Sequence, residues 1–220
     1  MDSTIRAVQK HGASVSMDQI AAEAKTSKTM IYKYFTDKAG LQKAISLRYV
    51  SDLLNAVPEG DVQPAGSIES LRPLLEHFFS LIEKEPELYF FINMAQFNNQ
   101  VSTARFVRFD ALAEAVVLEA LREISPDSEL TSLGKAAART WNDGMRAVVI
   151  AVAERWLKAR VSANDPHRER IDGFDEAEDA LAHVTASRLI DQLIGQIDCS
   201  LSYLVEVEWP NAAMQIGTNL

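Results

Sequence analysis

The stretch that decides the fold is S-M-D-Q-I-A-A-E-A-K-T-S-K-T-M-I-Y-K-Y-F-T-D-K, residues 16 to 38. It predicts two short helices joined by a turn. Ser16 is a favourable N-cap residue, and Gln19 follows at the capping-box spacing, so the first helix is expected to begin at Met17. Its helical pattern ends near Lys25.

The second short helix is expected to be capped by Thr26 or Ser27 and to extend to about Tyr34. Ile31 and Phe35 are four residues apart, which places both on one buried face. Two short helices joined by a turn of three to four residues form a helix-turn-helix, whose second helix fits the major groove of DNA.

The outward side of this second helix combines positive charge, hydroxyl groups and two phenols. Lysine and tyrosine suit phosphate oxygens, whereas lysine, threonine and the apolar tip of methionine suit base edges. The alternative is a solvated basic helix, but a purely solvated face has little use for tyrosine. The side chains concerned are Lys28, Thr29, Met30, Tyr32, Lys33 and Tyr34, with Lys25 and Lys38 at the two ends.

The run from Ile20 to Lys38 resembles the DNA-binding domain of the TetR family of bacterial transcriptional regulators. It carries the Y-x-Y-F-x-x-K ending of the family signature at residues 32 to 38. The resemblance implies that Lys28, Thr29, Met30, Lys33 and Tyr34 face bases or backbone, and that Tyr32, Lys38 and Ser16 contact phosphates. Together with the turn, the predicted DNA-binding set is Ser16, Lys25, Ser27, Lys28, Thr29, Met30, Tyr32, Lys33, Tyr34 and Lys38.

The chain departs from the family pattern at two places. Lys25 stands where the family usually has a turn glycine, so either this residue adopts a left-handed conformation or the turn differs. The first helix of the chain is expected to be short, beginning almost at Met1 and ending before Gly12. Minor-groove contacts from an N-terminal arm are therefore not expected.

Charge is divided unevenly along the chain. The net charge of −9 argues against a nucleic-acid binder. Residues 1–48, however, hold eight Lys and Arg against four Asp and Glu, whereas the remaining residues hold 14 against 27. The basic part therefore coincides with the helix-turn-helix motif, and an acidic body would help confine DNA contact to it.

The whole chain is predicted to be all-α, because no strand pattern is present. We expect a three-helix helix-turn-helix domain over residues 1–48, followed by a larger helical effector-binding and dimerisation domain over residues 49–220. Expected later helices begin at Ser67, at Pro86, near Leu130 and near Asp175. The last two are long, extending to about Val161 and Val207, and suit a four-helix bundle between two copies of the chain.

The resemblance also implies a repressor that binds a palindromic DNA operator as a homodimer and is released by a small-molecule effector. Apolar wall residues and nearby polar groups predict a largely hydrophobic effector. The candidate ligand-binding residues are Phe78, Phe90, Met94, Phe97, Phe109, Trp141, Asn142 and Met145. Simple core packing is the alternative role for these aromatic residues.

Other classes of function have weaker support. The single cysteine, Cys199, excludes a disulfide framework within the chain, and we expect it to be buried. No signal segment and no apolar run of 18 residues is present, which predicts a cytoplasmic protein without membrane contact. No cofactor and no metal site are expected.

Two rival hypotheses remain. An enzyme would need a recognisable catalytic motif, and none surrounds the four histidines. Asp179 and His183 are four residues apart and could bind a metal ion, although a surface pair is the simpler interpretation. The second rival is a helical ligand-binding or adaptor protein that has no specific DNA binding.

Overall fold

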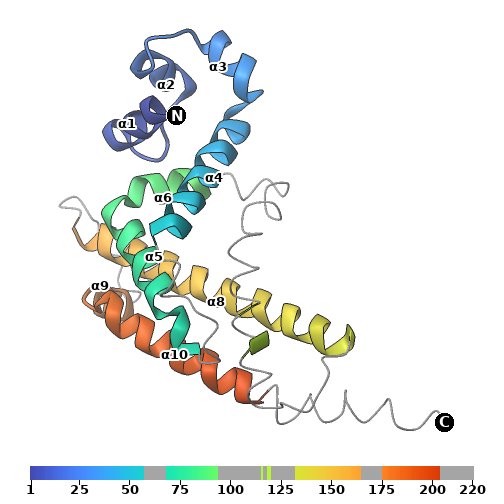
Figure 1. Cartoon of the computed structure of the whole chain (residues 1–220). Coiled ribbons are helices and arrows are strands. Elements are labelled where there is room, and N and C mark those ends of the chain that lie inside the picture. The colour runs from blue at the N-terminus through green and yellow to red at the C-terminus, as the bar shows by residue number, and fades with distance from the viewer. Residues whose placement is uncertain (57–67, 94–114, 116–117, 120–131, 165–174, 204–220) are drawn as a thin grey trace. The chain divides into compact units, whose positions relative to one another are not determined.

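The computed structural model describes residues 1–56, 68–93, 132–164 and 175–203, together with residues 115, 118 and 119. Every regular element in these ranges is a helix (Figure 1), which confirms the all-α prediction. The chain divides into two compact units, Met1–Ala56 with Ser80–Val107 and Val57–Phe79 with Arg108–Leu220. The sequence-based boundary at residue 48 stays a prediction.

The described helices of the first unit are α1 (Asp2–His11), α2 (Met17–Glu23), α3 (Lys28–Phe35), α4 (Lys38–Ala56) and α6 (Pro86–Asn93). Helices α2 and α3 begin after the caps expected from sequence, Ser16 and Ser27. Asp37 precedes α4, and its Oδ1 accepts a hydrogen bond from the Gly40 amide at 2.7 Å. Pro86 opens α6, where its missing N–H leaves no helical bond unmade.

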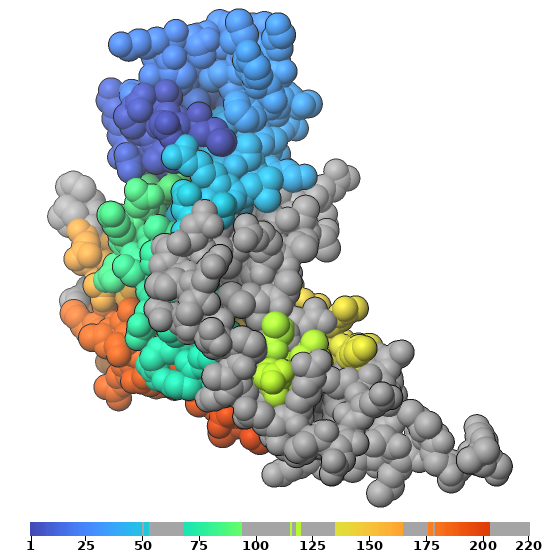
Figure 2. All heavy atoms as spheres, in the orientation of Figure 1, coloured from blue at the N-terminus to red at the C-terminus, as the bar shows by residue number. Residues whose placement is uncertain are grey.

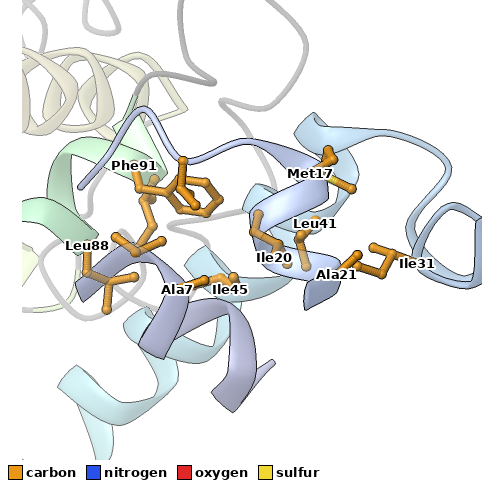
Figure 3. Packing of buried hydrophobic residues seen from close by; sticks show 12 residues of the cluster. Ala7, Met17, Ile20, Ala21, Ile31, Leu41, Ile45, Leu88 and Phe91 are labelled. Carbon is orange, nitrogen blue, oxygen red and sulfur yellow. The ribbon is translucent and has the colours of Figure 1, made fainter. Parts of the chain in front are cut away.

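One apolar cluster holds these five helices together. Figure 3 shows Leu88 and Phe91 of α6 in the same interior as residues of α1, α2 and α4. Its members are Ala7, Val8, Val15, Met17, Ile20, Ala21, Ile31, Leu41, Ile45, Leu88, Phe91 and Ile92. Helix α6 therefore belongs to the same core as the helix-turn-helix, although some 30 residues separate it from α4 in sequence.

The described part of the second unit contains the 3₁₀ helix η1 (Ile68–Leu71), α5 (Arg72–Lys84) up to Phe79, α8 (Ser132–Ala163), α9 (Asp175–Ala182) and α10 (Ala186–Tyr203). Trp156 of α8 is fully buried, and its ring centroid lies 5.4 Å from that of Phe79. Arg72 joins the start of α5 to α10 through an ion pair with Asp191 at 2.7 Å.

The helix expected from Ser67 begins differently. Residues Ile68–Leu71 form a 3₁₀ turn before α5 starts at Arg72. Pro73 explains this, because it has no N–H to donate to the carbonyl of Glu69 in an α-helical bond.

The single helix expected from about 175 to 207 is wrong: α9 ends at Ala182 and α10 begins at Ala186. Thr185 caps α10, since its Oγ1 accepts a hydrogen bond from the Arg188 amide at 3.3 Å. The carbonyl of Val184 accepts one from Nε1 of Trp156 at 2.9 Å. That carbonyl is thus directed to α8 instead of along a continuous helix.

The expectation that Cys199 is buried is also wrong. Cys199 is exposed on α10, whose buried stripe is formed instead by Leu189, Ile190, Leu193, Ile194, Ile197 and Leu201.

Candidate nucleic-acid interface

The first helix of the predicted motif, α2, is held at its start by the expected capping box. Oγ of Ser16 accepts a hydrogen bond from the Gln19 amide at 3.2 Å, and Oε1 of Gln19 accepts one from the Ser16 amide at 2.8 Å. This exchange satisfies two backbone donors that the helix itself leaves free.

The turn between α2 and α3 is a Schellman motif with a lysine in the glycine position. The amide of Thr26 donates to the carbonyl of Ala21 at 3.0 Å, and the amide of Lys25 donates to that of Ala22 at 3.1 Å. Lys25 has φ +51°, so it is left-handed as one of the two sequence-based alternatives predicted. The lysine side chain is exposed.

Helix α3 begins directly after this turn. Oγ of its N-cap, Ser27, accepts a hydrogen bond from the Met30 amide at 3.1 Å. Ile31 faces the core and is 7% exposed, whereas Phe35 is only partly buried against it. One side of α3 therefore packs, and the other side is available to a partner.

The outward side of α3 carries the expected residues, and Figure 2 shows the surface of the N-terminal helices in blue. Tyr34 is 73% exposed, Met30 45% and Tyr32 38%, which is unusual for side chains of this size. Lys28, Thr29 and Lys33 are exposed between them. The helix thus presents phenol rings, a thioether and ammonium groups to the solvent at the same place.

The lysines of this surface differ in their partners. Nζ of Lys28 forms an ion pair with Oδ2 of Asp18 at 2.9 Å, and this hydrogen bond raises the pKa of Lys28. In the described part of the chain, Lys25 and Lys33 form no ion pair. The sequence analysis did not include Asp18. Asp18 and Lys28 are ten residues apart, and no local pattern indicates that the packing of α2 on α3 brings their side chains together.

Lys38 does not share the exposed surface. Its Nζ donates to the Val15 carbonyl at 2.7 Å and lies 5.6 Å from the ring centroid of Phe91. Burial lowers the pKa of this ammonium. Its phosphate contact stays a prediction, and the structure gives the same group a bond within the first unit.

The predicted effector-binding residues are divided between the two units and the part of the chain outside the described residues. Phe90 belongs to the first unit, and Met94, Phe97 and Phe109 lie outside the described residues. In the second unit, Nε1 of Trp141 donates to Oγ of Ser200 at 2.9 Å, and that hydroxyl lies 3.5 Å from Sδ of Met145. Asn142 is buried on α8.

Phe78 packs edge-on against Phe79, with ring centroids 5.6 Å apart. This contact fits the core-packing alternative for Phe78 as well as a pocket wall. The effector-binding role of the whole set stays a prediction.

Among the described residues, no group of three or more His, Cys, Asp and Glu side chains could hold a metal ion. Of the pair considered for a metal ion, Asp179 lies on α9 and His183 follows its last residue, Ala182, so the metal-binding role stays a prediction beside the simpler surface pair. None of the described helices is both long enough and apolar enough to cross a membrane.

Comparison with known proteins identifies the N-terminal part. Residues 1–45 match the family model described as "Bacterial regulatory proteins, tetR family". Two uncharacterized HTH-type transcriptional regulators, from two strains of Mycobacterium tuberculosis, are each 35% identical over 94 residues, which is 42% of this chain and 40% of theirs. The HTH-type transcriptional activator FasR of Mycolicibacterium smegmatis is 30% identical over 146 residues, 66% of this chain and 64% of that protein. The matched part thus spans between two fifths and just under two thirds of these relatives.

Proposed function

Because this chain belongs to the TetR family of bacterial regulatory proteins, we propose that it is a transcriptional regulator that binds double-stranded DNA through the outward side of α3. The observation that carries the proposal is the exposure of Met30, Tyr32 and Tyr34 on one short helix. The same helix exposes Lys33, and the turn before it exposes Lys25. Large apolar and aromatic groups are exposed together with cations where a polyanionic, stacked partner is to be bound.

The proposal includes a homodimer that reads a palindromic operator. A two-turn helix reads only a few base pairs, whereas two copies spaced by one DNA turn, about 34 to 36 Å, read two half-sites. The exposed side of α8 supports an interface between copies, because it carries a stripe of small, uncharged residues at helical spacing. These residues are Gly144, Ala147, Val148 and Ala151. On α10, Gly195 and Cys199 are exposed and four residues apart. Small residues allow helices of two copies to approach closely.

The proposed mode is repression, with release by a small, mostly hydrophobic effector that binds the second unit. The relative FasR is described as an activator, so activation is the alternative mode. Coupling between an effector and an operator typically amounts to about 1 to 3 kcal/mol. Tight binding of only small, highly charged metabolites would contradict the predicted effector class.

The experiment that tests DNA binding is selection of bound sequences from random duplex DNA with the full chain. A palindrome with half-sites about 10 base pairs apart is expected. Transcription from a promoter that overlaps the selected site then separates repression from activation. Selection that enriches no sequence would favour the rival hypothesis of a ligand-binding or adaptor protein.

A further inference from the structure

A carboxylate from α6 binds the backbone of the turn between α1 and α2. Oε2 of Glu87 accepts a hydrogen bond from the amide of Ala13 at 2.6 Å, across 74 residues of sequence. A hydrogen bond to an ionised carboxylate is roughly twice as strong as one between neutral groups. This bond therefore fixes a turn that contains no regular structure of its own.

Gly12 makes room for that carboxylate. It ends α1 with φ +78°, a left-handed conformation that favours glycine. A β-carbon at this position would lie 3.2 Å from Oε2 of Glu87, closer than carbon and oxygen normally approach. Gly12 thus allows both the conformation of the turn and the close approach of the Glu87 carboxylate.

The other end of the same turn is held by α4. The Val15 carbonyl oxygen accepts a hydrogen bond from Nζ of Lys38 at 2.7 Å, and Val15 is 1% exposed. The next residue, Ser16, is the N-cap of α2 and a predicted phosphate contact. Two charged side chains, one from α6 and one from α4, therefore fix the backbone on which Ser16 is placed.

Helix α6 is in turn fixed to the helix-turn-helix at several points. Nε2 of Gln42 donates to the Phe91 carbonyl at 2.7 Å in a buried position, and Nε2 of Gln9 donates to Oε1 of Glu85 at 3.2 Å. Phe91 itself is fully buried. Glu87 consequently approaches the turn from a support that is part of the same core.

We propose that Glu87 is a positioning residue for operator binding: its carboxylate holds the α1–α2 turn so that Ser16 and α2 are correctly placed on the DNA backbone. This inference rests on the proposed function. Glu87 lies outside the helix-turn-helix region itself, since the matching family model covers residues 1–45.

The direction of the effect distinguishes positioning from simple electrostatics. Loss of an acidic side chain makes the protein less negative, which by itself strengthens binding to DNA. Positioning predicts the opposite for Glu87→Ala, namely weaker binding to the operator. Affinity for a scrambled duplex, which depends on charge, is expected to stay unchanged or to rise slightly.

The test compares the full chain with Glu87→Ala, Glu87→Gln and a charge-matched control, Glu76→Ala, whose side chain is exposed on α5 in the second unit. Affinities for the selected operator and a scrambled duplex are measured at fixed salt. We expect Glu87→Ala to lower the operator-to-scrambled ratio roughly tenfold. Glu87→Gln retains an acceptor oxygen and is expected to restore most of the ratio, while Glu76→Ala leaves it unchanged.

Amide hydrogen exchange without DNA supplies an independent readout. The Ala13 amide is expected to exchange at least about tenfold faster in Glu87→Ala than in the wild type. An unchanged ratio in Glu87→Ala would overturn the inference, as would equal losses on both duplexes, which indicate partial unfolding only. If the wild type binds the operator and the scrambled duplex equally, the proposed function fails, and the inference fails with it. That outcome is seen with the wild type alone, so it is distinguishable from a failure of the inference, which needs the variants.

Discussion

Replacement of Lys25 by glycine is expected to stabilise the helix-turn-helix and to weaken its binding to DNA. Lys25 occupies the C′ position of a Schellman motif at φ +51°. A residue with a side chain costs roughly 1 to 2 kcal/mol in this conformation. Glycine avoids that strain but loses about 0.5 to 1 kcal/mol more through its freedom in the unfolded chain. The net gain from Lys25→Gly is therefore about 0.5 to 1 kcal/mol.

The stability assay must report on the first unit. The three tryptophans lie at positions 141, 156 and 209, so tryptophan fluorescence does not probe α2 or α3. Amide hydrogen exchange of these helices does, because it measures their local opening. Lys25→Gly is expected to slow exchange about two- to fivefold. Faster exchange would refute the argument that Lys25 is strained.

The DNA assay tests why a strained lysine stands in the turn. If Lys25 contacts a phosphate, Lys25→Gly reduces the dependence of log affinity on log salt by about 0.9 for each bound copy. Lys25→Arg keeps both the charge and the strained conformation, so its salt dependence should equal that of the wild type. Lys135→Gln, which removes an exposed lysine from α8, serves as the charge control. An unchanged salt dependence in Lys25→Gly would refute the phosphate contact.

Three further predictions concern single contacts. Asp18→Asn frees the ammonium of Lys28 and removes a negative charge from the surface. DNA affinity should therefore rise roughly threefold at low salt and less at high salt. Equal affinities of the variant and the wild type at low salt would contradict this prediction. Burial lowers the pKa of Lys38 below its ordinary value of 10.5, so between these two values the unfolded chain binds more protons than the folded chain. The free energy of unfolding should therefore rise with pH in this window and less steeply in Lys38→Met, as urea unfolding followed by far-UV circular dichroism can measure. Trp156→Phe removes the donor to the Val184 carbonyl and should destabilise the second unit by about 2 kcal/mol in the same assay, and a loss below about 0.5 kcal/mol would contradict the importance of that bond.

Sequence predicted well what depends on neighbouring residues. A capping box joins residues three positions apart, so Ser16 and Gln19 sufficed to place the start of α2. A lysine at the usual glycine position left two alternatives, a left-handed Lys25 or a different turn. The structure shows the left-handed conformation.

Sequence failed where distant residues decide. The apolar spacing includes Val184, yet the helix is interrupted between Ala182 and Ala186. There the Val184 carbonyl is bound by Trp156, 28 residues away in sequence. The inclusion of α6 in the first unit likewise depends on Gln42 and Glu87, whose partners are 49 and 74 residues distant. No local pattern contains that information.

The exposure of Cys199 follows from helical geometry. A helix turns by about 100° per residue, so Cys199 is rotated by about 200° from the buried Ile197. The surrounding sequence is rich in apolar residues, but helical periodicity places this thiol opposite the buried stripe.

We propose that α3 and the turn before it bind DNA as a cationic, sequence-reading surface. The most direct test of this claim is the affinity of the full chain for a selected operator and for a scrambled duplex across a salt series. Three exposed lysines in each of two copies, Lys25, Lys28 and Lys33, predict a slope of log affinity on log salt of about −5, with the operator bound at least about a thousandfold more tightly. Equal affinity for the two duplexes, or a slope near zero, would contradict the claim.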